Sequence, residues 1–166
     1  MKTIYCDMDG VIADFNSRYR QMFGILPLEA RDKKEGLFSK QWNTFVASRQ
    51  FTTLDKMPDA DELINFLKSV NEMKNYRVAI LSSTGGFDRH NTIQIQKRIW
   101  LESKAAADWP MVFVPGRRFK KGYADKYSLL IDDTYDVIES FDKAGGKAVW
   151  HKDAASTIEQ VKQWMS

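Results

Sequence analysis

The chain has 166 residues, 43% of them hydrophobic, and a formal charge of +3. This length predicts one principal domain with one substantial core and room for a small accessory lobe. The positive charge is too small to indicate a nucleic-acid partner by itself, and no apolar run approaches the roughly 20 residues that span a bilayer.

The first apolar run, Thr3 to Cys6, is predicted to be a buried strand. Cys6 is the single cysteine, so it cannot form a disulfide within the chain, and we interpret it as a packed strand residue in a reducing compartment. Because the N-terminus runs directly into this strand, we expect no signal peptide and a cytoplasmic location.

Two aspartates, Asp7 and Asp9, follow this strand, and Gly10 provides a turn directly after them. Carboxylates that leave the end of a buried strand together can hold a hard divalent cation, which prefers oxygen ligands. This pattern favours phosphate chemistry.

The stretch from Phe15 to Met57 is too long for a simple connection and contains no convincing strand. Two helical stripes occupy it, separated by the polar run from Arg31 to Glu35. The stripes comprise Phe15, Tyr19, Met22 and Phe23, and then Trp42, Phe45, Val46 and Arg49. We therefore predict a helical insert at residues 15–57, after which Asp59 is a suitable N-cap for a helix that returns to the main domain.

Downstream, apolar runs of strand length alternate with segments of helical period. The runs are Tyr76 to Leu81, Met111 to Val114, Ser128 to Ile131 and Lys147 to Trp150. This alternation predicts a doubly wound α/β domain with a parallel sheet covered by helices on both faces. Residues 1–14 and 58–166 would form this core domain.

Ligands of an open parallel sheet collect beyond the carboxyl ends of its strands. Polar residues follow four of the five predicted strands: Asp7 and Asp9, then Ser82 and Ser83, then the basic stretch Arg117 to Lys121, then Asp132 and Asp133. Any one of these groups alone could be a helix cap or a hydrated loop. Their recurrence at successive strand ends indicates a site.

In these signatures the sequence resembles the haloacid dehalogenase (HAD) superfamily of aspartate-dependent phosphotransferases. The matching segments are DMDGV at 7–11, AILSS with Ser82 as the strand-terminal serine, a lysine at 120 or 121, and LLIDD at 129–133. Within the superfamily the chain is most similar to the 5'(3')-deoxyribonucleotidases, through DMDGVIADF, FTTLDKMPDADELINFL and LLIDDTYDVIESF. The resemblance implies a Rossmann-like core and a small helical cap inserted after the first strand.

The resemblance also implies roles for the aspartates. Asp7 would be the nucleophile that forms an aspartyl phosphate, and Asp9 would protonate the leaving alkoxide and later activate water. Mg²⁺ would be held by the Asp7 carboxylate, the Asp9 backbone carbonyl and the Asp132–Asp133 pair. The second aspartate favours phosphate transfer over dehalogenation.

The phosphate contacts are expected from Ser82, with Ser83 adding a contact, and from one lysine. Spacing to the LLIDD segment favours Lys121 over Lys120, and places Lys126 too close to the strand. The lysine would neutralise charge that otherwise repels an anionic nucleophile, a repulsion of roughly 4 kcal/mol at 4 Å for an effective dielectric of 20.

An insert after the first strand would stand over the aspartates and could close over a small substrate. Phe15, Trp42, Phe45 and Phe51 are candidates for stacking on a nucleobase, although aromatic residues at helical spacing are more often core residues. The insert therefore favours a small phosphomonoester substrate, and the resemblance implies a deoxyribonucleotide first. We expect neither a membrane nor a nucleic acid as partner, and leave a homodimer open.

Two alternatives stay open at this point. A polynucleotide 3'-phosphatase or a sugar-phosphate phosphatase would keep the chemistry and change the substrate. A receiver-like phosphoacceptor also uses aspartate, hydroxyl, lysine and Mg²⁺, but takes its acceptor aspartate from a later strand and lacks a second catalytic aspartate.

Overall fold

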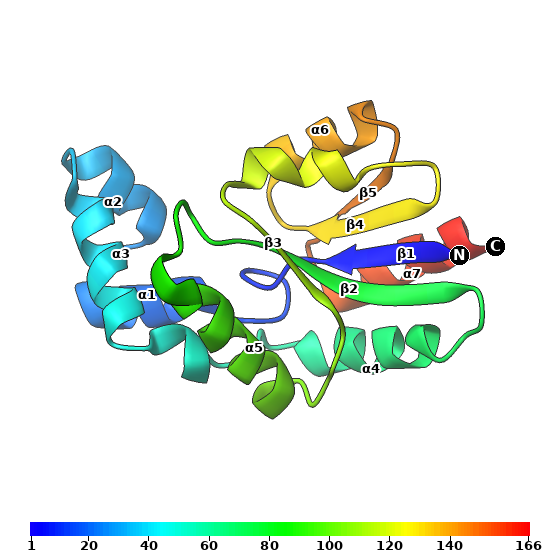
Figure 1. Cartoon of the computed structure of the whole chain (residues 1–166), viewed down its shortest axis with the longest axis horizontal. Coiled ribbons are helices and arrows are strands. Elements are labelled where there is room, and N and C mark those ends of the chain that lie inside the picture. Colours follow the sequence, from blue (N-terminus) through cyan, green and yellow to red (C-terminus); the bar gives the residue numbers. More distant parts are fainter.

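The computed structural model describes all 166 residues and contains a parallel sheet with the strand order β3-β2-β1-β4-β5 (Figure 1). The strands are β1 (Lys2–Cys6), β2 (Tyr76–Ser83), β3 (Met111–Val114), β4 (Ser128–Asp132) and β5 (Lys147–Trp150). This confirms the predicted doubly wound α/β fold. The order differs from the flavodoxin-like order 2-1-3-4-5, which weakens the receiver-like alternative.

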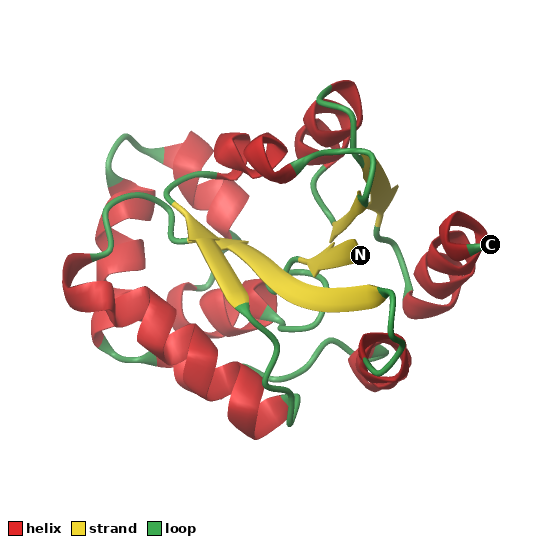
Figure 2. Ribbon diagram, turned by 45° about the vertical axis from the view of Figure 1, so that its right-hand side comes forward, coloured by secondary structure: helices red, strands yellow, loops and turns green.

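Helices cover both faces of the sheet (Figure 2). One face carries α4 (Ala60–Asn71), α5 (Thr92–Lys104), which follows the short 3₁₀ helix η2 (Arg89–Asn91), and α7 (Ala154–Met165). The other face carries α6 (Tyr135–Lys143) and the 3₁₀ helix η3 (Arg117–Tyr123).

Alternate residues of each central strand pack on opposite faces. Leu129 and Ile131 of β4 belong to the larger hydrophobic cluster, whereas Leu130 between them belongs to the smaller one beside α6. All three are fully buried. Burial on both faces is the reason that these strands appear in the sequence as continuous apolar runs.

The chain between β1 and α4 is helical and lies beyond the carboxyl end of β1 (Figure 1). It consists of α1 (Phe15–Phe23), α2 (Pro27–Lys33), α3 (Leu37–Ala47) and the 3₁₀ helix η1 (Gln50–Thr53). The polar run from Arg31 to Glu35, which was predicted to separate two helices, includes the end of α2. The sequence periodicity did not reveal this helix, because α2 buries only Pro27 and Ala30. None of the helices in the structure has the length and apolar character needed to cross a bilayer.

Asp59 occupies the predicted N-cap position of α4, but its side chain does not bond to that helix. Its Oδ2 instead accepts a hydrogen bond from the backbone N–H of Ala154, the first residue of α7, at 2.6 Å. The residue therefore links two helices that pack side by side on the sheet.

Candidate active site

The centre of the sheet brings the first and fourth strands together. Cys6 of β1 pairs with Ile131 of β4, and the backbone N–H of Asp7 donates to the Ile131 carbonyl at 3.0 Å. The next two strands in the sequence, β2 and β3, lie on one side of β1, whereas β4 and β5 lie on its other side. Such a change of direction is the place where open α/β sheets bind ligands.

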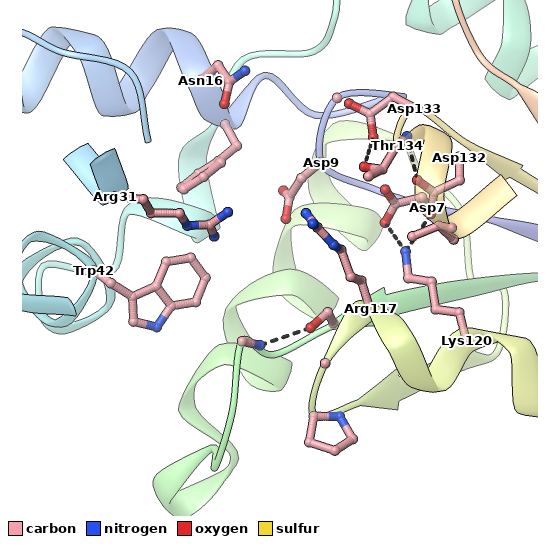
Figure 3. Close-up of a pocket in the computed structure, with 17 residues that line it drawn as sticks. Asp7, Asp9, Asn16, Arg31, Trp42, Arg117, Lys120, Asp132, Asp133 and Thr134 are labelled. Carbon is pink, nitrogen blue, oxygen red and sulfur yellow. Dashed lines mark hydrogen bonds and ion pairs between the residues drawn. The ribbon is translucent and has the colours of Figure 1, made fainter. Parts of the chain in front are cut away.

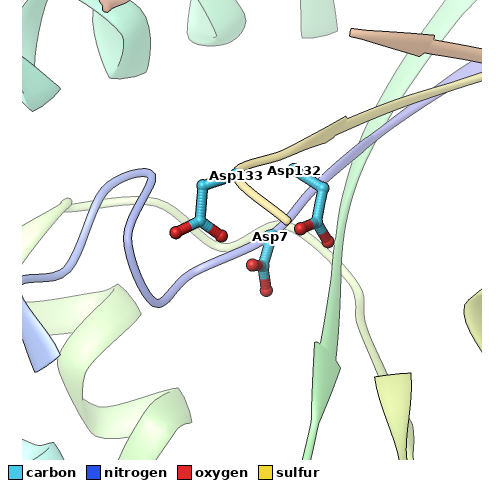
Figure 4. Close-up of side chains that lie close together, drawn as sticks. All are labelled: Asp7, Asp132 and Asp133. Carbon is cyan, nitrogen blue, oxygen red and sulfur yellow. The ribbon is translucent and has the colours of Figure 1, made fainter. Parts of the chain in front are cut away.

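Three carboxyl groups meet at this place. One oxygen from each of Asp7, Asp132 and Asp133 lies within 4.8 Å of the others (Figure 4). Asp7 and Asp132 are buried, whereas Asp133 is exposed as a whole residue but has its carboxyl group packed against Gly10. The structure thus brings together side chains that are more than 120 positions apart in the sequence.

A lysine lies between two of these carboxylates. Lys120 Nζ is 3.0 Å from Asp7 Oδ1 and 2.7 Å from Asp132 Oδ2 (Figure 3). Lys121, which the spacing favoured, is exposed and does not line the cleft described below. That prediction is corrected to Lys120, because the 3₁₀ helix η3 turns only one of the two adjacent lysines toward the sheet.

The loop after Asp7 is shaped by its backbone. The Met8 carbonyl accepts hydrogen bonds from the N–H groups of Val11, Ile12 and Ala13, and Gly10 has a positive φ of 82°. A Cβ atom at Gly10 would lie 2.0 Å from Asp133 Oδ2, so only glycine leaves room for this carboxylate. Three carboxylates and one lysine thus meet beside Gly10, in a space that any other side chain would fill. This set of oxygen atoms fits a divalent cation, which prefers oxygen ligands.

The electrostatics of this group are unbalanced in favour of negative charge. Burial, and then the neighbouring Asp132, raise the pKa of Asp7 well above its ordinary value despite Lys120. Burial of the carboxyl group and Asp132 likewise raise the pKa of Asp133 to about 6. Burial alone would lower the pKa of Lys120, but Asp7 and Asp132 together raise it. The group is therefore short of one or more cations.

The end of β2 places its two serines differently. Ser83 lines the cleft, and its Oγ accepts a hydrogen bond from the Gly85 N–H at 3.0 Å. Ser82 is fully buried, and its Oγ accepts a hydrogen bond from Lys97 Nζ at 2.8 Å. Because side chains alternate along a strand, only one of two adjacent serines can face the cleft. Of the two serines expected to contact phosphate, only Ser83 therefore lines the cleft.

The side chain of Asp9 faces Lys97, which the sequence motifs did not place in the site. Its Oδ2 is 3.0 Å from Nζ of Lys97 in α5, and its carboxylate is not part of the three-aspartate group. A signal for Lys97 existed, because it shares a helix face with the apolar residues Ile93, Trp100 and Leu101.

A cleft of about 400 Å³ opens above these residues (Figure 3). Phe15 of α1 and Trp42 of α3 line it, as expected of substrate contacts. Phe45 does not, because its ring is fully buried against Phe15 and Phe51, at ring-centre distances of 5.0 and 4.9 Å. Phe45 is thus a core residue, and its predicted contact with substrate is wrong.

Two arginines in the cleft were also not selected from the sequence. Arg31 of α2 stacks on Phe38 with its Cζ 4.2 Å from the ring centre, and it has no carboxylate partner. Burial, followed by the charge of Arg117, lowers the pKa of Arg31. Arg117, from η3, forms an exposed ion pair with Asp136 at 3.2 Å. Both guanidinium groups would attract an anionic ligand.

Comparison with known proteins adds evidence on the fold. No protein-family model matches the sequence, and no curated protein matches it. Among solved structures, a hydrolase from Streptococcus pneumoniae TIGR4 is similar, with a TM-score of 0.54, 14% identity, and coverage of 98% of this chain and 100% of the other. A protein from Burkholderia xenovorans LB400 assigned as a haloacid dehalogenase-like hydrolase has a TM-score of 0.55, 12% identity, and coverage of 99% and 98%.

The D,D-heptose 1,7-bisphosphate phosphatase from Burkholderia thailandensis is also similar, with a TM-score of 0.51 and 15% identity; 98% of this chain and 99% of that chain are covered. Identities at this level show a shared fold and leave the chemistry to be argued from the site. The chain therefore shares the fold of these three solved structures.

Proposed function

We propose that the chain is an Mg²⁺-dependent phosphomonoesterase that hydrolyses deoxyribonucleoside monophosphates through an aspartyl phosphate on Asp7. The observation that carries this proposal is the convergence of Asp7, Asp132, Asp133 and Lys120 at the change of direction in the sheet. Their arrangement combines a nucleophile, a cation and a cation-binding group, which phosphoryl transfer needs in one place.

Each residue of the site has a separate role in the proposed reaction. The Asp7 carboxylate attacks phosphorus, while Lys120 neutralises negative charge on the transferring oxygens and Ser83 donates a hydrogen bond to them. Asp9 gives a proton to the leaving oxygen and later takes one from the attacking water. Asp7, Asp132 and Asp133 would hold Mg²⁺, which when bound supplies further neutralisation of the phosphate charge.

The insert supports a small substrate with a planar base. Phe15 and Trp42 place aromatic faces on the cleft, and Trp42 lies close to the loop after β2, where a Cβ at Gly85 would be 3.1 Å from its ring. The helices α1 to α3 would then act as a cap over the aspartates. A sugar-phosphate phosphatase is the second candidate, because most residues that line the cleft are polar or charged.

Release of phosphate from dTMP, from a sugar phosphate and from a 3'-phosphorylated oligonucleotide, with Mg²⁺ and with chelator, tests the proposal. We expect Mg²⁺-dependent turnover with dTMP as the best substrate. No turnover of any of the three with Mg²⁺ present would refute the phosphomonoesterase. If a sugar phosphate or the oligonucleotide were the best substrate, the proposed nucleotide specificity would be refuted, but the proposed phosphatase activity would still hold.

Replacing Trp42 tests the stacking contact. Because a base stacked on an aromatic ring contributes about 1–3 kcal/mol, Trp42→Ala should raise KM for dTMP about 10-fold or more, and leave KM for glycerol phosphate nearly unchanged. Trp164→Ala is the matched control, since Trp164 packs on Tyr76 away from the cleft. Equal KM values for dTMP in the two variants would exclude Trp42 as a substrate contact.

Binding of Mg²⁺ should depend on pH. The raised pKa of Asp133, about 6 in the metal-free protein, means that this carboxyl group takes up a proton as the pH falls through that value. The proton then competes with the cation, so the affinity measured by calorimetry should be high near pH 8 and fall markedly by about pH 5. Affinity that does not change over this range would contradict the assignment of Asp133 as a ligand.

A further inference from the structure

Lys97 is a buried cation on the inner face of α5. Its side chain is 1% exposed, although its helix neighbours on this face are the apolar Ile93, Trp100 and Leu101. Burying an ammonium group is costly unless charge and hydrogen bonds compensate it. A lysine at such a position therefore requires partners that only the folded chain supplies.

The partners of Lys97 account for all three of its N–H donors. Nζ lies 3.0 Å from Asp9 Oδ2, 2.8 Å from Ser82 Oγ and 3.0 Å from the Ser83 carbonyl oxygen. It also lies 4.9 Å from the centre of the Phe51 ring in η1. One side chain thus joins the second aspartate to the end of β2.

The other oxygen of Asp9 has no such partner. Asp9 Oδ1 is buried and makes no hydrogen bond, although the residue lines the cleft (Figure 3). Lys97 therefore holds the carboxyl group by one oxygen and leaves the second one without a hydrogen-bond partner, in a residue that lines the cleft. A general acid or base must offer an atom that is free to exchange a proton with the reacting group.

We propose that Lys97 is the positioning residue for Asp9: it fixes Oδ2 against the end of β2, so that Oδ1 is the atom that exchanges the proton. This inference rests on the proposed phosphatase function and deepens it. Lys97 itself does not touch substrate. It acts through the orientation of Asp9, which otherwise could rotate within a cleft of about 400 Å³.

The two chemical steps depend on Asp9 in opposite ways. In the first, an Asp7 oxygen forms a bond to phosphorus, the bond from phosphorus to the leaving oxygen breaks, and the proton of Asp9 passes to that oxygen. In the second, water attacks phosphorus, the bond to Asp7 breaks, and a proton of the water passes to Asp9. A leaving group that is stable as an anion needs no proton from Asp9 in the first step. The second step still requires Asp9, because it is the same for every substrate.

The test compares two substrates in the variant Lys97→Met, which keeps the length of the side chain and removes its charge. With an alkyl phosphate such as dTMP, turnover should fall about 10²-fold, the lower end of what general acid–base catalysis contributes. With p-nitrophenyl phosphate, the first release of p-nitrophenol should stay within about threefold of wild type. Hydrolysis of the aspartyl phosphate should then be slow, giving a burst of one equivalent per site.

Two further variants separate this role from folding. Lys104→Met, at the exposed end of the same helix, is the matched control and should behave as wild type with both substrates. Lys97→Gln keeps hydrogen-bond donors for Asp9 and Ser82, so it should show the same difference between the two substrates with a smaller loss of turnover. This variant replaces Lys97→Met in the test if Lys97→Met does not fold. Circular dichroism and thermal unfolding identify folded variants.

The outcomes are distinguishable. A burst with p-nitrophenyl phosphate, together with a larger loss for dTMP, supports the positioning role. Equal losses for both substrates without a burst, or no loss in a folded variant, would overturn it and leave Lys97 as a structural ion pair. Failure of the proposed function would instead appear in the wild-type protein, as absence of phosphate release from either substrate.

Discussion

Asp7→Asn is expected to lower phosphate release by about 10³-fold or more at saturating substrate, because the amide cannot form the acyl phosphate. The fold should persist. Burial and Asp132 already disfavour the ionised form of Asp7, as its raised pKa shows, so a neutral group of the same shape should not destabilise the metal-free protein. Steady-state phosphate release and thermal unfolding measure the two effects.

Asp61→Asn is the matched control for this substitution. Asp61 forms an exposed ion pair with Lys56, and such pairs contribute about 0–1 kcal/mol. Its replacement should leave both activity and stability nearly unchanged. Activity retained in Asp7→Asn, in a preparation free of wild-type protein, would exclude Asp7 as the nucleophile.

The second large effect is expected at Lys120. Lys120→Met leaves Asp7 and Asp132 without their cation, and breaking a buried ion pair in this way costs about 3–5 kcal/mol of unfolding free energy. The loss of a group that neutralises the transferring phosphate should lower kcat by about 10²-fold or more. Urea unfolding and steady-state kinetics provide the two measurements.

Lys121→Met provides a comparison at the adjacent position. Because Lys121 is exposed and forms no ion pair in the structure, its replacement should change the unfolding free energy by less than about 0.5 kcal/mol and leave kcat close to wild type. Equal effects at the two positions, or a larger effect at Lys121, would contradict the site as described.

The fold could be predicted from the sequence because its strands are buried on both faces. Residues such as Leu129, Leu130 and Ile131 leave no polar alternation, so each strand appears as an apolar run of the right length. The positions of Asp7 and Asp132 followed from the rule that ligands collect at carboxyl ends of parallel strands. Helix α2 was missed because only two of its residues are buried.

The parts of the site that the sequence could not supply depend on the orientation of single side chains. Spacing cannot decide between Lys120 and Lys121, because the choice follows from how the 3₁₀ helix η3 packs against the sheet. The same applies to Ser82 and Ser83 at the end of β2. Phe45 shares the helical stripe of Trp42, yet only tertiary packing turns one ring to the cleft and the other to the core.

Lys97 shows a different limit of sequence reasoning. Its position on an apolar helix face marks it as unusual, but its partners Asp9, Ser82 and Ser83 come from two other segments of the chain. A buried lysine is compatible with a structural ion pair as well as with a role at a site. The contact with Asp9 connects Lys97 to the proposed acid–base step.

In the proposed reaction, Asp7 attacks phosphorus beside a cation held by the neighbouring carboxylates. Protein quenched in acid during turnover of p-nitrophenyl phosphate with Mg²⁺, then digested and analysed by mass spectrometry, tests this directly. We expect a phosphoryl group on Asp7 that is absent when Mg²⁺ is chelated. A phosphoryl group on another residue, or its formation without a divalent cation, would contradict it.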